Sequence, residues 1–390
     1  MTKILGITRS YYLLADTRSR REAEALAMRG DQVDFIALAE PNHPPIEVIN
    51  NVRVIRLPLS RYRGSSNLRY ILSYFKFFIF ASLKTCSLFL KNRYQVIHVH
   101  TMPDFIVFVA LIPKLLGAKV ILDMHETMPE LYMSKFGLPE NHFLIRLIKF
   151  QEKISFMFAD KILCVHEPHK ALLIKRGAQE KKITVVLNLP DPQIFGNRTS
   201  ADSMDKQDDK LRIVYHGTVA ERLGLDIALK AFHEVVQEFP DARFEIYGDG
   251  DFSKKVEELI QELGLEKNVY FSKKFFRLEE VLSFIRGATF GIIPNRKDSA
   301  TEYMLPVKML EYLYVGIPVI VPKLLTINYY FDENSMAFYT PGDYHQLAQV
   351  IIRLYLNKTE RRKLIENSQK FLDRFSWDLM KQELFKVIDN

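Results

Sequence analysis

The stretch Glu302-Tyr-Met-Leu-Pro-Val-Lys-Met-Leu-Glu-Tyr-Leu-Tyr-Val-Gly-Ile-Pro-Val-Ile-Val-Pro322 predicts a loop, a short helix and a buried strand, in that order. Pro306 is typical of the first turn of a helix, where its missing N–H leaves no hydrogen bond unmade. Gly316 suits the residue that follows a helix, and Pro318 prevents the helix from continuing. The apolar run at 319–321 has the length and composition of a buried parallel strand. A helix that leads directly into such a strand indicates an α/β fold.

The start of this helix could bind an anionic ligand. In an open α/β sheet, ligands bind where loops leave the carboxyl ends of strands, and the free N–H groups of a helix start favour phosphate. Lys308 and Glu311 lie three residues apart, so they share one face of the helix. They could hold a sugar nucleotide, with the lysine on phosphate and the glutamate on the ribose hydroxyls. An ordinary amphipathic helix with a surface Lys and Glu explains the same residues equally well.

Length, charge and cysteine content limit the class of protein. The chain has 390 residues, which suits two domains better than one. The net charge of +7 favours anionic partners such as phosphates or anionic lipid, and we expect no nucleic-acid partner. The two cysteines, Cys86 and Cys164, lack the spacing of a metal site, so we expect a reducing, cytoplasmic setting. The residues directly after Met1 resemble a strand and give no sign of a signal peptide.

Strands and helices alternate from the beginning of the chain, which predicts parallel sheets covered by helices. A polar stretch at 197–210 is almost free of apolar residues and is predicted to be a linker. It separates a first domain at 1–196 from a second at 211–372, and two such domains would leave a cleft between them. The first helix is expected to have Asp16 as its N-cap. The strands are predicted at 4–8, 32–38, 52–57, 96–100, 119–124, 161–165 and 183–187 in the first domain, and at 211–217, 242–248, 268–271, 288–293 and 319–321 in the second.

Residues 61–93 are rich in aromatic and apolar side chains and contain several cations. Lys76 and Lys84 interrupt the apolar sequence, so it lacks the roughly 20 uninterrupted apolar residues of a membrane-spanning helix. The segment could lie in a membrane interface with its cations on anionic lipid, or it could pack on the sheet while its lysines extend to solvent. We favour packing for the body of the helix and peripheral contact with an anionic membrane for its basic end. That end holds three arginines, Arg61, Arg63 and Arg69.

Three further loops follow predicted strands and carry residues suited to binding. Arg222 lies in a loop ahead of a helix, where it would offer a forked donor to an anion, although the arginine of a plain turn would be solvated. Gly248 and Gly250 follow a strand where backbone could approach a flat ring or a ribose, although a plain turn explains them too. His125 follows another strand and could donate a hydrogen bond to a substrate hydroxyl, although a single histidine is more often structural. Each residue alone therefore has a structural explanation beside the functional one.

In their order and spacing, these residues resemble the motifs of a family 4 glycosyltransferase with the GT-B fold, and the likeness covers nearly the whole chain. The resemblance rests on Asp16-Thr-Arg-Ser-Arg-Arg-Glu-Ala23, His98-Val-His100, Asp123-Met-His-Glu126 with Pro129-Glu130, Val186-Leu-Asn-Leu-Pro190, Tyr215-His-Gly-Thr-Val-Ala-Glu-Arg-Leu-Gly-Leu-Asp226, Tyr247-Gly-Asp-Gly250, and Leu305-Pro-Val-Lys-Met-Leu-Glu-Tyr312 with Gly316-Ile-Pro-Val319. Each motif is modest alone, and their order and spacing together are specific.

The resemblance implies two Rossmann-like domains, with residues 373–390 forming a helix that crosses back to the first domain. It implies a retaining, metal-independent glycosyltransferase that takes a sugar from a UDP- or GDP-sugar as co-substrate and uses no other cofactor. The donor would bind mainly to the second domain and the acceptor mainly to the first. The acceptor would be a glycan or a lipid-linked acceptor in the biosynthesis of a surface polysaccharide or another glycoconjugate.

The resemblance also assigns roles to individual residues. His125 matches a histidine that contacts the donor sugar, and Glu311 matches the glutamate that holds the ribose. No acidic pair has metal-ligand spacing, so Arg222 and Lys308 would stabilise the charge of the departing diphosphate, and these two residues and His125 would be catalytic. Donor binding is expected from Gly217, Thr218, Arg222, Gly248, Gly250, Tyr303, Met304, Leu305, Pro306, Lys308 and Glu311. The acceptor side is expected to include Arg9, Arg18, His100 and Glu126.

The donor loops depart from the family pattern at three positions. The first glutamate of the family's Glu-x7-Glu motif touches the donor sugar, and here it falls on Tyr303, with Glu302 one residue away. The Arg-x4-Lys of the phosphate loop falls on Thr218 and Leu223. The adjacent Arg222 would then supply the missing charge.

The acceptor loop also departs from the pattern, because residues 9–15 replace a glycine-rich segment. Together the departures leave two other functions open. One is a non-catalytic GT-B subunit or scaffold, which would not need the missing residues. The other is a nucleotide-sugar epimerase on the same architecture, which would need cleft carboxylates that the sequence lacks.

Overall fold

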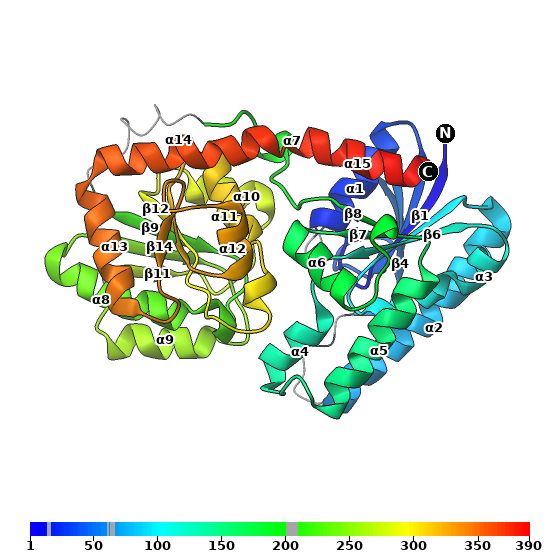
Figure 1. The fold of residues 1–390 in the computed structure, drawn as a ribbon, viewed down its shortest axis with the longest axis horizontal. Helices are drawn as coiled ribbons and strands as arrows, with labels where there is room; N and C mark the ends of the chain where they lie inside the picture. The colour runs from blue at the N-terminus through cyan, green and yellow to red at the C-terminus, as the bar shows by residue number, and fades with distance from the viewer. Residues whose placement is uncertain (14–16, 61, 63–66, 200–209) are drawn as a thin grey trace. The chain divides into compact units, whose positions relative to one another are not determined.

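The computed structural model describes residues 1–13, 17–60, 62, 67–199 and 210–390. The chain forms two compact units: unit 1 contains Met1–Asn188 and Asp378–Asn390, and unit 2 contains Leu189–Trp377. Each unit is an α/β domain built on its own sheet (Figure 1). The expected fold class of two parallel-sheet domains is therefore confirmed. The predicted N-cap Asp16, the arginines Arg61 and Arg63, and most of the predicted linker lie outside the described residues.

Unit 1 contains an eight-stranded sheet with the order β3-β4-β2-β1-β5-β6-β7-β8. Its strands are β1 (Lys3–Ile7), β2 (Gln32–Leu38), β3 (Ile46–Ile49), β4 (Val52–Leu57), β5 (Val96–His100), β6 (Lys119–Met124), β7 (Lys161–Cys164) and β8 (Ile183–Val185). The strands pair in parallel except β3, which is antiparallel to β4. The sequence pattern does not predict β3, because this edge strand has no buried face and so shows no apolar alternation.

Helical segments connect these strands: α1 (Thr17–Met28), α2 (Asn67–Asn92), the 3-10 helix η1 (Asp104–Ala110), α3 (Leu111–Leu115), α4 (Met128–Phe136), α5 (Phe143–Phe158), α6 (Glu167–Lys175) and η2 (Glu180–Lys182). The inner face of α2 packs on the sheet, because Phe77 and Phe89 share one apolar core with Ile106 of η1 and Leu122 of β6. Burial of such side chains supplies most of the stability of an amphipathic helix.

The last helix, α15 (Trp377–Asp389), brings residues from the end of the sequence into unit 1. The Lys119 ammonium at the start of β6 donates to the carbonyls of Val387 and Ile388, at 2.8 and 2.6 Å. A cation at the C-terminus of a helix is favourable, because the last carbonyls have no partner within the helix. On the same helix, the sulfur of Met380 accepts from the backbone N–H of Leu187 at 3.3 Å. These contacts attach α15 to β6 and to the segment that follows β8.

Unit 2 contains a six-stranded, fully parallel sheet with the order β11-β10-β9-β12-β13-β14. Its strands are β9 (Arg212–His216), β10 (Arg243–Tyr247), β11 (Val269–Phe271), β12 (Phe290–Ile292), β13 (Val319–Pro322) and β14 (Ala337–Tyr339). Its helical segments are α7 (Pro192–Phe195), η4 (Glu221–Leu223), α8 (Leu225–Glu238), α9 (Ser253–Glu262), α10 (Leu278–Ile285), η5 (Thr301–Tyr303), α11 (Val307–Tyr314), α12 (Leu325–Tyr330), α13 (Tyr344–Leu356) and α14 (Lys358–Arg374). The sequence pattern does not predict β14, which is too short to show a period.

The stretch at 302–322 forms the expected loop, helix and strand. Pro306 precedes α11 as its N-cap, one position earlier than expected. Gly316 follows the helix in the left-handed conformation, with φ of 73°, and all four residues of β13 are buried. The helix lies close over β12, since a Cβ on Gly291 would meet the Tyr312 ring at 2.2 Å. This packing fixes the start of α11 at the carboxyl end of the sheet.

The order of strands reverses once in the chain path of each sheet. In unit 1, β1 lies between β2 and β5, and in unit 2, β9 lies between β10 and β12. Loops on either side of such a reversal diverge to opposite faces of the sheet, and they leave room for a ligand at the carboxyl ends of the strands. The candidate site residues of each unit gather at these positions.

Candidate functional site

Two loops of unit 2 lie side by side at the carboxyl ends of β9 and β10. The Gly217 N–H donates to the Tyr247 carbonyl and the Val219 N–H donates to the Asp249 carbonyl, each at 2.9 Å. A Cβ on Gly248 would lie 1.8 Å from the Gly217 oxygen, and one on Gly250 would lie 2.0 Å from the Val219 oxygen. Both glycines are therefore required by contact between the loops. The approach of a ring or ribose is not needed to explain them.

Lys308, in the first turn of α11, extends over the first of these loops. Its ammonium lies 3.8 Å from the centre of the Tyr215 ring and 3.3 Å from the position of a Cβ on Gly217. Burial lowers the pKa of Lys308 to about 7, and Arg222 adds to the effect while Glu311 opposes it. An ammonium kept in such a place is destabilising without an anion. A depressed lysine pKa is therefore a sign of a functional site.

Arg222, in η4, is the second cation at this end of unit 2. Its Nε is buried and has no hydrogen-bond partner among the residues that the structure describes. The loop that carries it turns at Gly224, where a Cβ would lie 1.9 Å from the Pro294 carbonyl oxygen. The loop is thus fixed against the segment that follows β12. A buried donor without a partner close to the half-buried ammonium of Lys308 is suited to bind an anion.

Glu311 is buried on the same helix and has a partner that the sequence analysis missed. Its Oε2 lies 2.6 Å from Nε2 of His216, and Nδ1 of that ring lies 2.9 Å from the Tyr312 hydroxyl. His216 ends the buried strand β9 directly before Gly217. A histidine at the carboxyl end of a buried strand could have been predicted as a site residue from the sequence. Its contact with Glu311 could not, because that contact depends on tertiary packing. The contact fixes the carboxylate that is expected to hold the ribose.

The segment between η5 and α11 shows why Glu302 does not replace the missing family glutamate. Its carboxylate accepts from the backbone N–H of Leu325 at 2.6 Å and pairs with the Lys297 ammonium at 3.3 Å. Glu302 therefore caps the start of α12, and half-buried Tyr303 remains at the expected position. The structure places the remaining predicted donor residues at this end of unit 2: Thr218 in the β9 loop, and Met304, Leu305 and Pro306 ahead of α11.

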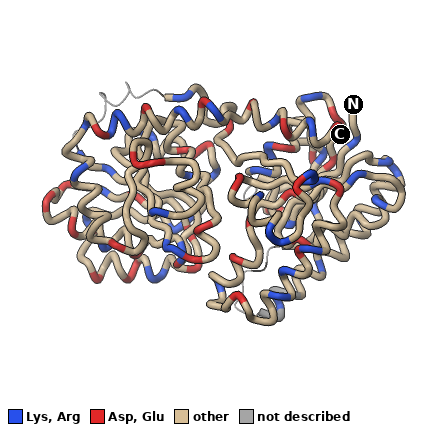
Figure 2. The backbone as a smooth tube through the Cα atoms, viewed as in Figure 1, with Lys and Arg blue, Asp and Glu red and all other residues tan. Residues whose placement is uncertain are grey.

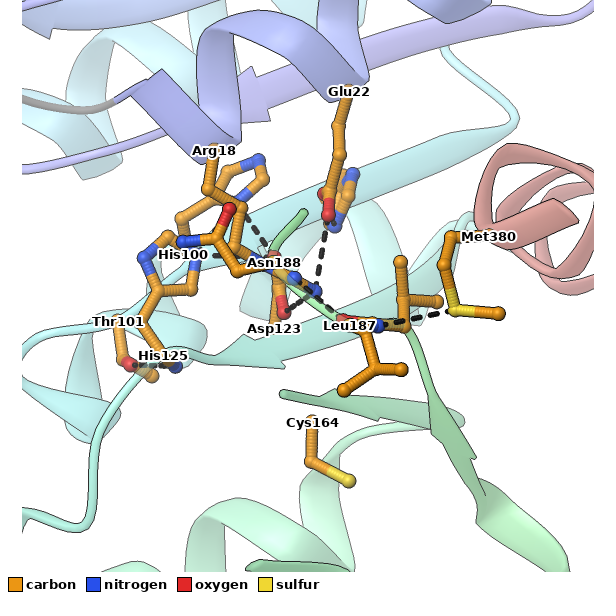
Figure 3. Close-up of polar contacts among 12 residues, drawn as sticks. Arg18, Glu22, His100, Thr101, Asp123, His125, Cys164, Leu187, Asn188 and Met380 are labelled. Carbon is orange, nitrogen blue, oxygen red and sulfur yellow. Dashed lines mark hydrogen bonds and ion pairs between the residues drawn. The ribbon is translucent and has the colours of Figure 1, made fainter. Parts of the chain in front are cut away.

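The unit 1 site is centred on Asp123, which is fully buried near the end of β6. Its carboxylate accepts from Arg18 Nε at 3.0 Å and from Nη2 at 2.9 Å. His100 Nδ1 and His125 Nε2 lie 3.1 and 3.0 Å from its Oδ2 (Figure 3). Burial alone would raise the pKa of Asp123, but Arg18, then His125 and the hydrogen bonds from both histidines, hold it well below its usual range. An ionised carboxylate thus positions the two imidazoles.

Arg18 lies behind this site, with its guanidinium occupied by protein groups. Beyond its contacts with Asp123, it donates to the Val186 carbonyl at 2.6 Å and lies 3.0 Å from Glu22 (Figure 3). Only 2% of its side chain is exposed. In this structure Arg18 therefore positions Asp123, and it does not reach a surface where an acceptor could touch it.

Glu22 and His98 extend the group behind Asp123, and the sequence analysis missed both as site residues. Burial raises the pKa of Glu22 to about 8 in spite of Arg18, and burial together with His100 lowers the pKa of His98 well below its usual value. Glu22, His98, His100 and Asp123 place ligand atoms within 4.8 Å of one another, as a metal site requires. Arg18 already contacts the carboxylates of Glu22 and Asp123. Its guanidinium therefore lies where a metal ion would bind and supplies the positive charge that the ion would bring. Arg18 and Glu22, four apart on α1, were the available sequence signal.

His125 is the accessible member of the unit 1 site. Its side chain is 18% exposed, whereas that of Asp123 is fully buried. Glu126 follows it and is half-buried. Arg9 is tied to α2, because its Nη2 donates to Ser73 at 2.8 Å and its guanidinium lies 3.7 Å from the centre of the Tyr74 ring. Of the two histidines that contact Asp123, His125 is therefore the one that a ligand can reach.

Comparison with known proteins supports an enzyme with these two units. The model "Glycosyl transferase 4-like domain" matches residues 15–188, and "Glycosyl transferases group 1" matches residues 197–371. An uncharacterized glycosyltransferase of Methanocaldococcus jannaschii is 24% identical over 59% of this chain and 60% of its own length. A chitobiosyldiphosphodolichol beta-mannosyltransferase of Debaryomyces hansenii is 23% identical over 89% of this chain and 77% of its own.

The fold comparison agrees with the family models. The crystal structure of Anabaena HepE in complex with UDP covers all of this chain and all of its own, with a TM-score of 0.70 and 14% identity. At this identity the likeness establishes the fold alone. The family models match most of the chain in the order of its two units. The chain therefore belongs to the glycosyltransferases of the GT-B fold that join a glycosyl transferase 4-like domain to a group 1 domain.

Proposed function

We propose that this glycosyltransferase takes its sugar from a UDP- or GDP-sugar bound at the unit 2 site. The observation that carries the proposal is Lys308, a half-buried lysine whose pKa is lowered to about 7, with Arg222 close enough to contribute to the shift. A nucleotide diphosphate would neutralise both cations. Glu311, held by His216, would accept hydrogen bonds from the ribose. A UDP complex is known for Anabaena HepE, and either base is compatible with the residues of this chain.

We propose further that the reaction is metal-independent and retains the configuration of the sugar. When the bond between sugar and diphosphate breaks, negative charge develops on the leaving phosphate. Lys308 and Arg222 would stabilise that charge, and one well-placed donor changes a rate by roughly 10²–10³. The acceptor hydroxyl would attack from the side of the leaving group and give its proton to the departing phosphate. His125, aligned by Asp123, would donate a hydrogen bond to the sugar.

For the acceptor we propose a glycan or a lipid-linked acceptor, used at the cytoplasmic face of the membrane in the assembly of a surface polysaccharide or another glycoconjugate. The name of the Debaryomyces relative includes a dolichol diphosphate acceptor, which supports the lipid-linked class. His125, as the accessible member of the unit 1 site, is the residue that such an acceptor would approach.

The test is a panel of UDP-, GDP- and ADP-sugars in a thermal-shift assay, followed by NMR of the donor with and without EDTA. We expect one base class to raise the melting temperature and to be hydrolysed slowly, with no loss on chelation and with retained anomeric configuration in the product. Glu311→Ala and Lys308→Met should abolish both signals. If no sugar nucleotide binds, or if both variants support full function in cells, the chain would be a non-catalytic member of the family.

A further inference from the structure

The strongest unexplained feature of unit 1 is a set of exposed apolar side chains on α2, α3 and α5. More than half of the exposed large apolar residues in the described part of the chain lie on these three elements and the residue after α3. Those on α2 are Leu72, Phe75, Ile79, Phe80, Leu83 and Leu90. Those on α3 and α5 are Leu111, Ile112, Leu115, Leu116, Phe143, Leu144, Leu147, Phe150, Ile154 and Met157. We call this set the apolar face.

The spacing shows that the apolar face is a continuous stripe on each long helix. On α2, Leu72, Phe75, Ile79 and Leu83 follow one another at three or four residues, which is one side of a helix. The buried residues of α2, such as Phe77 and Ala81, lie on the opposite side. The helix is therefore apolar toward the core and apolar toward the outside. Exposed patches of this kind mark an interaction surface.

The elements of the apolar face are joined within unit 1 by η1. Phe75 of α2 stacks on Phe105 of η1 at 6.0 Å between ring centres, and Phe108 of η1 lies 5.0 Å from Phe158 of α5. The chain passes from η1 directly into α3. Both long helices, α2 and α5, pack against η1. η1 thus connects the elements of the apolar face.

Cations accompany the apolar face, and two of them, Lys114 and Lys149, pair with Asp160 and Glu140 next to these elements. Lys and Arg recur along α2 and α5 (Figure 2). These cations are Arg69, Lys76, Lys84 and Lys91 on α2, Lys114 on α3, and Arg146, Lys149 and Lys153 on α5. The only acidic residue in the three elements is Glu152, and it is buried. Apolar side chains with lysines and arginines at their edge match the boundary between acyl chains and anionic headgroups.

We propose that the apolar face docks unit 1 on an anionic membrane, with α2 and α5 lying in the plane of the interface. The occupant is a lipid surface rather than a second copy of the chain. In a symmetric dimer, the same patch would meet itself, so the lysines of α2 would oppose one another. Membrane binding by this surface does not depend on catalysis. Its purpose, access to a lipid-linked acceptor, rests on the proposed function.

An interfacial position explains α2 better than a spanning one. Its segment Leu72–Asn92 is long and apolar enough to cross a membrane by length and composition, and 33% of it is buried inside the protein. A spanning position would remove Phe77 and Phe89 from the core that they share with the sheet. The interfacial position leaves that core intact and buries only side chains that are already exposed. It also extends the membrane contact beyond the basic end predicted from the sequence.

The experiment is vesicle flotation of the purified full chain, without donor or acceptor. The vesicles contain phosphatidylcholine alone or mixed with phosphatidylglycerol. An apolar variant carries Phe75→Ser, Ile79→Ser and Leu83→Ser, and a charge variant carries Lys76→Gln, Lys84→Gln and Lys91→Gln. Matched controls change exposed residues of unit 2. These are Tyr270→Ser with Leu356→Ser, and Lys254→Gln with Lys267→Gln and Lys363→Gln.

We expect the wild type and both controls to float with the anionic vesicles. The charge variant should bind them on the order of 100-fold more weakly, at about fivefold for each cation near the surface. The apolar variant should lose binding even in low salt. Circular dichroism and the donor-induced thermal shift should be unchanged in both variants. The last two readouts separate failure of this proposal from failure of the proposed function.

Four outcomes would overturn the proposal. They are no flotation of the wild type, equal binding to neutral and anionic vesicles, full binding by the apolar variant, and a stable dimer in ultracentrifugation that both variants dissociate. Alkaline carbonate extraction of cell membranes tests the orientation. Release of the protein supports interfacial helices, and retention of the protein would show that α2 spans instead.

Discussion

Lys308 is half-buried, and its ammonium lies over the Tyr215 ring at the start of α11. Its pKa is lowered to about 7, first by burial and then by Arg222. At neutral pH, therefore, the free protein is a mixture of the charged and neutral forms. A bound diphosphate would raise this pKa, because an opposite charge favours the ammonium. Binding of the donor should then take up a proton.

We predict that donor affinity is highest below pH 7 and falls as the pH rises through 7, by up to tenfold per unit. The sign follows because only the charged lysine binds the anion, while the diphosphate of a sugar nucleotide does not itself titrate there. Calorimetry in buffers of different ionisation enthalpy measures the proton uptake. Lys308→Arg should bind without this dependence, since arginine stays charged. A wild-type affinity that is flat between pH 6 and 9 would contradict the assignment.

His216 should act as a positioning residue through Glu311. We predict that His216→Phe raises the KM for the donor by about 10- to 100-fold, because a hydrogen bond to a charged group contributes roughly 1.5–3 kcal/mol. The value of kcat should change less. Tyr312→Phe removes only the partner of the other ring nitrogen and should have a smaller effect on KM. A purely structural role would instead lower the melting temperature and leave KM unchanged, so both are measured.

At the scale of single residues, the sequence predicts a role best where a residue type in a given position has one common function. Lys308, Glu311 and Arg222 were predicted because a cation or a carboxylate near the start of a helix suggests a ligand. His216 was missed because its role depends on a contact across 95 residues of sequence. Gly248 and Gly250 were predicted because the backbone there could approach a ligand. In the structure, contact between the β9 and β10 loops is what requires these glycines. Contacts between distant segments do not appear in a local pattern.

At the scale of elements, buried strands were easier to predict than exposed ones. The structure gives β2, β4, β5 and β6 the predicted bounds, since buried strands are rich in apolar residues. The antiparallel edge strand β3 lacks that pattern. For α2, the sequence left packing and membrane contact as alternatives. Both faces of α2 are apolar, so the sequence could not show which residues face the sheet.

The contact between the β9 and β10 loops leads to a prediction about stability. Gly250→Ala places a Cβ 2.0 Å from the Val219 oxygen, and a backbone neighbour cannot yield as a flexible side chain can. We expect a loss of about 1–3 kcal/mol in urea unfolding together with loss of donor binding, because the loop that carries Arg222 would shift.

Gly342→Ala is the matched control for this change. Unlike Gly250, Gly342 has a conformation that strains alanine, with φ of 90°, and a Cβ there meets no atom within 4 Å. The control should retain donor binding and lose only the free energy of backbone strain, of order 1–2 kcal/mol. If Gly250→Ala binds the donor as the control does, the two loops are not coupled in the way that the structure indicates.

At the scale of the whole molecule, the two units do not correspond to two continuous stretches of the sequence. Unit 1 contains the beginning and the end of the chain, and α15 is attached to it through Lys119, Leu187 and Arg29. Unit 2 lies between them in sequence and has its own apolar core. The linker predicted from composition at 197–210 lies mostly outside the described residues, and the two units divide at Asn188 and Leu189. The return of the last helix was expected from the family resemblance, because composition and periodicity do not encode such a contact.

This arrangement predicts which unit a mutation near the end of the chain destabilises. Leu384 in α15 and Leu372 in α14 are both buried, and replacement of either by alanine should cost about 2–5 kcal/mol. Calorimetry with hydrogen-exchange mass spectrometry should show Leu384→Ala weakening peptides of β1 and β6 in unit 1. Leu372→Ala should weaken peptides of unit 2 instead. A saturating sugar nucleotide, at about 100 times its Kd, should stabilise unit 2 by roughly 2.7 kcal/mol and leave unit 1 unchanged. Equal weakening of both units by Leu384→Ala would show that they unfold as one body, and then α15 could not be assigned to unit 1 alone.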